Sequence, residues 1–119
     1  MGLFDKFKKN KNTCLDCSII LNDNDVEKYL KLGQLKWICI LSPVFGGVED
    51  RSNQILVTSE AEQEKQLIDE ELINFLKQGK SVKKLNMNFE YKKNSLVVSK
   101  LFISAIVDGK DYKKVINVW

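Results

Sequence analysis

The chain has 119 residues, of which 44% are hydrophobic and 29% are charged, and its net charge is +3. This length and composition are typical of one soluble globular domain that can form a core without a disulfide or a metal ion. Histidine is absent, so Ser/His/Asp and Cys/His nucleophile systems are excluded and the commonest metal ligand is missing. We therefore expect a protein that acts by binding and is not an enzyme.

No apolar run approaches the roughly 20 residues of a membrane-spanning helix, and the first nine residues do not have the form of a signal peptide. The three cysteines are an odd number, which does not indicate a disulfide framework. We predict a cytoplasmic protein folded as a single domain over residues 1–119. Within it, residues 1–12 are predicted to be a mobile or loosely packed N-terminal segment.

The first half of the chain predicts two short helices and two strands. Residues 2–9 and 22–32 have apolar side chains at three- and four-residue spacing, as in amphipathic helices. The second of these has candidate capping asparagines at its start and a glycine after its end. Residues 36–41 and 53–58 are apolar and partly β-branched, so they predict strands.

Residues 59–78 predict the longest helix of the chain. Ser59 and Glu62 have the spacing of a capping box, and Gly79 follows the last turn. An apolar stripe is expected to pack this helix on the rest of the domain. The stripe consists of Ala61, Leu67 or Ile68, Leu72, Phe75 and Leu76.

The last part of the chain predicts three strands over residues 85–91, 96–107 and 112–119. Asp108 and Gly109 form a typical two-residue hairpin turn between the last two strands. Since the connections are short, these three strands must be antiparallel. We predict an α+β fold with an antiparallel sheet of about five strands, one long helix packed across it, and short N-terminal helices.

Charge is unevenly distributed along the sequence. Residues 59–79 hold two lysines and six acidic residues, net −4, whereas residues 80–119 hold nine lysines and three acidic residues, net +6. The modest total charge therefore hides an acidic helix beside basic strands.

The loop over residues 42–53 contains the only proline and the only arginine of the chain. Functional groups are frequent on such loops, although its paired glycines lack the Gly-Lys-Ser/Thr ending of a phosphate-binding loop. We predict that the loop contacts a partner protein through Phe45, Glu49, Asp50 and Arg51. The alternative is a hairpin loop whose Phe45 packs into the core.

The predicted long helix exposes a series of carboxylates. An exposed helix face offers them no apolar pocket, so acid–base catalysis is not indicated. We predict instead an electrostatic surface for a basic protein, with Glu64, Asp69, Glu70 and Glu71 as contact residues. A solvated helix face without a partner is the alternative interpretation.

Cys14 and Cys17 form a Cys-x-x-Cys pair, which is half of a zinc knuckle. A structural zinc site needs four ligands, and only Cys39 remains as a further thiol. We therefore predict no metal and no other cofactor.

The nine lysines of residues 80–119 suggest nucleic acid as an alternative partner, since Tyr91 and Tyr112 lie among them. The chain has few aromatic residues in positions suited to stacking on bases, and a single arginine. Bidentate arginine contacts are the commonest means of reading guanine, so this composition favours a protein partner over nucleic acid.

Four features of the chain indicate one class of proteins. They are a short α+β domain, the absence of a set of catalytic residues, the start Gly2-Leu-Phe-Asp-Lys-Phe7, and the loop Leu41-Ser-Pro-Val-Phe-Gly-Gly47. In these the chain resembles the small cytosolic immunity proteins encoded beside bacterial toxins, including those of contact-dependent inhibition systems. The resemblance implies a non-enzymatic module that binds and neutralises a cognate toxin domain. These proteins share no fold, so no site residue is transferred. Many nuclease inhibitors of this type are strongly acidic, and this chain differs in its net charge of +3.

Overall fold

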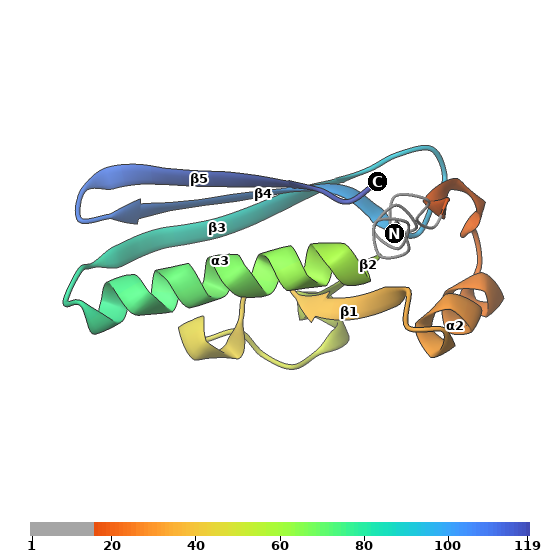
Figure 1. Ribbon diagram of the computed structural model, residues 1–119, viewed down its shortest axis with the longest axis horizontal. Coiled ribbons are helices and arrows are strands. Elements are labelled where there is room, and N and C mark those ends of the chain that lie inside the picture. Colours follow the sequence, from red (N-terminus) through yellow and green to blue (C-terminus); the bar gives the residue numbers. More distant parts are fainter. Residues whose placement is uncertain (1–15) are drawn as a thin grey trace, which may run out of the picture.

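The computed structural model describes residues 16–119. Its elements, shown in Figure 1, are the 3₁₀ helix η1 (Cys17–Ile19), α2 (Asp23–Lys31), β1 (Leu35–Cys39), the 3₁₀ helices η2 (Pro43–Phe45) and η3 (Arg51–Asn53), β2 (Gln54–Thr58), α3 (Ser59–Lys77), β3 (Val82–Tyr91), β4 (Val98–Val107) and β5 (Lys110–Asn117). The α+β class and the order of these helices and strands are as predicted. The helix predicted over residues 2–9 lies outside the described residues.

The five strands of residues 16–119 form two antiparallel sheets, which corrects the prediction of one sheet. β1 pairs with β2, and a second sheet has the order β3-β4-β5. The reason is the position of α3, which follows β2 directly and has 19 residues, a length of about 28 Å. Because the helix carries the chain this far, β3 begins away from β2 and pairs with its own hairpin neighbour. In Figure 1, α3 lies between the three-stranded sheet and β1.

The two α-helices in the described part of the chain, α2 and α3, begin at side-chain caps. The Asn22 side chain accepts a hydrogen bond from the Asp25 amide (2.9 Å), as the sequence allowed. The capping box predicted at Ser59 is wrong, because Thr58 Oγ1 accepts from the Ala61 amide (3.3 Å) and is the cap of α3. The Ser59 hydroxyl instead donates to the carbonyl of Gly33, which ties the start of α3 to the end of α2.

The main hydrophobic core lies between β2 and β4, where side chains such as Val57 and Leu101 are completely buried. The first turn of α3 adds Ala61 to this core, and Leu72 is buried further along the helix. Of the two alternatives predicted for the stripe, Ile68 packs against the core and Leu67 is 65% exposed. The stripe is only partly correct, because Leu76 is 44% exposed. None of the helices in the part of the chain that the structure describes is both long and apolar enough to cross a membrane.

The two edges of the three-stranded sheet differ in regularity. β4 and β5 pair without interruption from Val107↔Lys110 to Lys100↔Asn117. Asp108 and Gly109 both have positive φ (51° and 79°), which confirms the predicted hairpin turn. β3, in contrast, has a register irregularity near Lys84, whose φ is also positive (52°).

Candidate functional site

The loop over residues 42–53 is held in shape by Asn53. The Asn53 side chain accepts from the Leu41 amide (3.0 Å) and donates to the carbonyls of Leu41 (2.9 Å) and Val48 (2.8 Å). A Cβ atom added at Gly47 would lie 1.8 Å from the Leu41 carbonyl oxygen, so only glycine fits there. The loop is therefore a defined surface, and Asn53 is a residue that the sequence analysis did not single out.

In this loop two valines are more exposed than Phe45, which was predicted to contact a partner. Phe45 is half-buried in η2, although it is not part of the main core. Val44 and Val48 are each 58% exposed and form the apolar part of the loop surface. The loop therefore offers a partner two exposed aliphatic side chains.

The charged residues predicted for this loop are exposed, and two of them have local roles. Glu49 is exposed, and Asp50 caps η3 by accepting from the Ser52 amide (3.3 Å). The Arg51 guanidinium lies over the Trp37 ring, 4.2 Å from its centroid, in a cation–π contact. Arg51 is thus positioned by β1 at the base of the loop.

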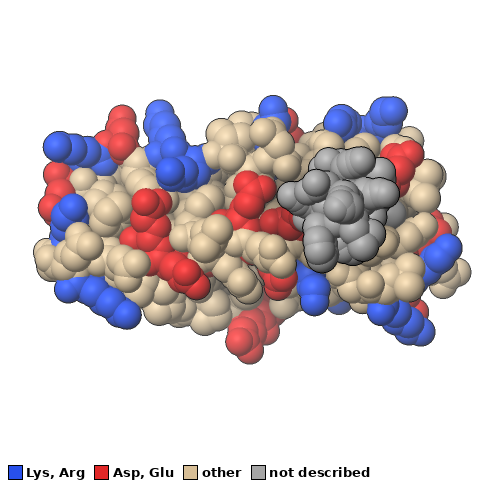
Figure 2. Space-filling model, viewed as in Figure 1, with Lys and Arg blue, Asp and Glu red and all other residues tan. Residues whose placement is uncertain are grey.

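The acidic residues of α3 are divided between two sides of the helix. Glu62 and Asp69 line a cavity of about 210 Å³ that also includes Trp37 and Pro43. Glu64 and Glu71 line a groove between α3 and β5, and Glu70 is exposed. In the view of Figure 2, acidic side chains lie along the middle of the molecule, where α3 runs in Figure 1. The predicted loop and acid residues therefore do not form one continuous site.

Asp69 corrects the prediction of an exposed acid, because it is paired with a buried lysine. Lys65 is 6% exposed, and its Nζ atom lies 3.0 Å from both carboxylate oxygens of Asp69. The sequence contained a signal for this burial, since Lys65 shares the helix face of Ala61 and Leu72 at spacings of four and seven residues. From the sequence, Lys65 was counted only in the net charge of residues 59–79, and its burial was not predicted.

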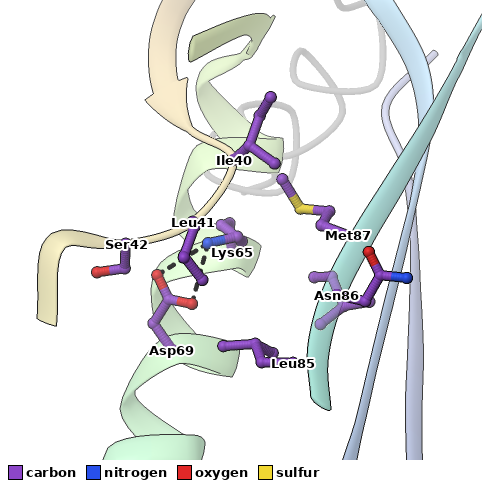
Figure 3. Close-up of a pocket in the computed structure, with 9 residues that line it drawn as sticks. Ile40, Leu41, Ser42, Lys65, Asp69, Leu85, Asn86 and Met87 are labelled. Carbon is purple, nitrogen blue, oxygen red and sulfur yellow. Dashed lines mark hydrogen bonds and ion pairs between the residues drawn. The ribbon is translucent and has the colours of Figure 1, made fainter. Parts of the chain in front are cut away.

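Apolar side chains from the three-stranded sheet and from the segment after β1 surround this pair, as Figure 3 shows. Leu85 and Met87 point from β3 towards α3, and the chain that follows β1 closes the other side. The cavity has a volume of about 230 Å³ and is lined by Ile40, Leu41, Ser42, Lys65, Asp69, Leu85, Asn86, Met87 and Ile103. Because Asp69 already neutralises the only cation in this lining, we assign the pair a structural role.

Of the Cys-x-x-Cys residues, only Cys17 lies in the part of the chain that the structure describes. Cys17 is buried in η1 and Cys39 is half-buried in β1, whereas Cys14 lies outside the described residues. Among residues 16–119, no three Cys, Asp or Glu side chains come together in a way that could hold a metal ion.

The groove between α3 and β5 combines apolar and charged walls. Its volume is about 400 Å³, and it is lined by Glu64, Leu67, Ile68, Glu71, Lys114, Val115 and Ile116. Leu67 on the helix wall is 65% exposed, and the strand wall carries Lys114 and the buried Ile116. An apolar side chain of a partner could thus cover Leu67, with carboxylates beside it.

Tyr112 fixes the position of Glu71 in this groove. Its hydroxyl donates to Glu71 Oε1 (2.6 Å), and its ring contacts Phe75 edge to face at a centroid distance of 5.9 Å. Partial burial and, second, the hydrogen bond to Glu71 raise the pKa of Tyr112 above its usual range. From the sequence, Tyr112 was noted only as an aromatic residue among the lysines of residues 80–119. Its hydrogen bond to Glu71 on α3 was not predicted.

The substitution Tyr112→Phe should change the pH dependence of stability. The raised pKa keeps Tyr112 protonated in the folded chain at pH values where the unfolded chain loses this proton. The free energy of unfolding of the wild type should therefore decrease as the pH rises above about 10. The contribution of Tyr112 to this decrease should be absent in the variant. At neutral pH the variant should lose about 1 kcal/mol with the hydrogen bond. Urea unfolding at a series of pH values measures both effects. If the free energy of unfolding depended on pH in the same way in the variant and the wild type above pH ~10, the raised pKa of Tyr112 would be contradicted.

No protein-family model matches the chain, and no curated protein matches its sequence. The function is therefore inferred from the geometry and charge of the chain's own residues.

Proposed function

We propose that the protein is a non-enzymatic protein-binding module that neutralises a partner, most concretely as an immunity-type inhibitor of a toxin domain. One observation carries the proposal: among the described residues, most acidic side chains of α3 have no paired cation. Among residues 16–119, the ion pair Lys65–Asp69 stands alone. Within this part of the chain, Glu60, Glu64, Glu70 and Glu71 are exposed on the same helix without a paired lysine.

The chemistry of α3 also indicates what kind of partner fits. Exposed carboxylates attract a basic surface over a distance and increase the rate of association. Leu67 lies among them and is 65% exposed, so the surface combines an apolar centre with a charged rim, as protein interfaces commonly do. The partner should therefore present an apolar side chain surrounded by lysine or arginine.

The loop provides a second contact region on the other side of α3. Val44 and Val48 are exposed there, and Arg51 is held on Trp37. A partner that covers α3 can reach this region as well as the groove beside β5. As an immunity-type inhibitor, the protein would act in the cytoplasm of a bacterial cell, where it would meet the toxin.

Reversing two helix charges should weaken partner binding. Glu64→Lys combined with Glu70→Lys changes exposed residues and leaves Lys65–Asp69 and Glu71–Tyr112 intact. The partner is first captured from the native cell with the tagged full chain and identified by mass spectrometry. Calorimetry with the purified partner should then show an affinity about tenfold lower for the variant, with a larger difference at low salt.

The matched control is Glu27→Lys with Glu90→Lys, which makes the same charge change at exposed positions of α2 and β3. It should leave the affinity within about twofold of the wild type. Equal affinity of the helix variant and the wild type would show that α3 is not the contact surface. Nuclease-sensitive material in place of a stoichiometric protein would instead support nucleic acid as the ligand. Phe89 and Tyr91, which are 36% and 52% exposed beside Lys92 and Lys93, favour that second candidate.

A further inference from the structure

β5 is an exposed and regular edge strand. It pairs on one side with β4 through eight consecutive residue pairs, and among residues 16–119 no strand pairs with its other side. The opposite edge, β3, is interrupted by its irregularity near Lys84. Such irregularities prevent an edge from accepting another strand, whereas a regular edge can accept one.

The hairpin turn determines which backbone groups of β5 point outward. With a two-residue turn, Val107 and Lys110 form a hydrogen-bonded pair, and hydrogen-bonded pairs then recur at every second residue. Tyr112, Lys114 and Ile116 therefore direct their backbone groups to β4. The amides and carbonyls of Asp111, Lys113, Val115 and Asn117 point away from the sheet, and they are the groups that a further strand would bind.

The groove between α3 and β5 lies beside this row of backbone groups. A strand that paired with β5 would direct every second side chain towards α3 and the side chains between them to the other face of the sheet. On the α3 side these side chains would meet Leu67, Lys114 and Ile116, with Glu64 and Glu71 at either end. On the other face they would lie near Lys113.

We propose that β5 binds an extended segment of the partner protein as a fourth strand of the sheet. This inference rests on the proposed function as a protein-binding module. Charge complementarity defines the segment: towards α3 it has an apolar residue between two basic residues, and the alternate positions opposite Lys113 are acidic. Backbone hydrogen bonds supply affinity, and the groove supplies selectivity for this pattern.

A second copy of the chain does not fit this edge. β5 carries Lys110, Lys113 and Lys114 with a single acidic residue, Asp111. Pairing of β5 with its own copy would bring these lysines together, and like charges on neighbouring strands are unfavourable. The lysines thus disfavour self-association while they attract an acidic strand.

The test uses a nine-residue peptide with lysine, valine and lysine at three alternate positions and glutamates at the positions between them. A peptide of the same composition, with the valine moved to the glutamate face, is the control. Titration of the isotope-labelled full chain, followed by nuclear magnetic resonance, should show binding about tenfold tighter for the first peptide. It should also slow hydrogen exchange at the amides of Lys113 and Val115. Equal affinities of the two peptides would overturn the proposal, as would protection of these amides in the chain alone.

The variants Lys113→Pro and Lys113→Ala separate backbone pairing from side-chain effects. Both remove the lysine side chain, but only proline removes the outward amide, and an edge strand tolerates proline at such a position. Lys113→Pro should bind the peptide about fivefold to tenfold more weakly than Lys113→Ala, with the β4–β5 pairing still visible in the spectrum. Equal binding by the two variants would overturn strand addition. So would a dimer of the wild type that is lost in Lys113→Pro, since the occupant would then be a second copy.

The captured partner distinguishes failure of this inference from failure of the proposed function. Suppose that Lys113→Pro and Lys113→Ala bind the partner equally, while the α3 charge reversal weakens partner binding. The protein-binding function then stands, and strand addition is wrong. If Lys113→Pro binds the partner more weakly than Lys113→Ala, β5 is part of the interface.

Discussion

Asp69→Ala should destabilise the protein by about 3 kcal/mol, because it leaves the Lys65 ammonium group buried without its counter-charge. Lys65 is 6% exposed, and the apolar side chains of Ile40, Leu85 and Met87 line the cavity around it. None of these can replace the two contacts of 3.0 Å that Asp69 provides. Urea unfolding followed by circular dichroism gives the change in the free energy of unfolding.

Two further variants show that the effect belongs to the pair. Glu70→Ala removes the neighbouring exposed carboxylate and should cost less than about 0.5 kcal/mol. The double variant Lys65→Met with Asp69→Leu should regain most of the lost stability, since replacing both members of a buried ion pair with apolar residues is often neutral. A loss for Asp69→Ala as small as that for Glu70→Ala would mean that Lys65 reaches water when it is unpaired.

Gly47→Ala should destabilise the protein by about 3 kcal/mol, because the new methyl group overlaps the backbone of Leu41. The added Cβ atom would be 1.8 Å from the Leu41 carbonyl oxygen and 2.9 Å from Asn53 Nδ2. The loop must therefore move away from β1, and the hydrogen bonds of Asn53 to Leu41 and Val48 must lengthen or break. Urea unfolding measures the loss, and the amide resonances of Leu41 and Val48 report the movement of the loop.

Gly46→Ala is the matched control for this prediction. Gly46 has nothing within 4 Å of an added Cβ atom, but its φ is +96°, so alanine there should cost about 1 kcal/mol of backbone strain. The difference between the two variants isolates the steric overlap at residue 47. Equal losses in the two variants would show that the loop adjusts freely and is not held by Asn53.

Features that depend on neighbouring residues could be predicted from the sequence. The Asp108-Gly109 turn, the capping Asn22 and the alternation of apolar residues in β3 each follow from local backbone and side-chain preferences. The two sheets could not be predicted in this way. Which strand pairs with which depends on where α3 carries the chain, and this is a property of the whole fold.

The candidate site could be predicted only in part, for the same reason. The acids of α3 were recognised by composition, but their division between two sides of the helix depends on what packs against each side. Lys65 was missed although its spacing from Ala61 and Leu72 places it on the buried face. The pairing of Tyr112 with Glu71 joins residues 41 positions apart, which no local pattern indicates.

The direct passage from β2 into α3 has a consequence for the order in which the chain folds. Thr58 is at once the last residue of β2, opposite Leu35, and the cap of α3. Forming the first turn is the slow and unfavourable step for a helix, and pairing of β1 with β2 already holds Thr58 in the extended conformation that a cap requires. We therefore expect the β1–β2 hairpin to nucleate α3, so that folding of the two elements is one cooperative event.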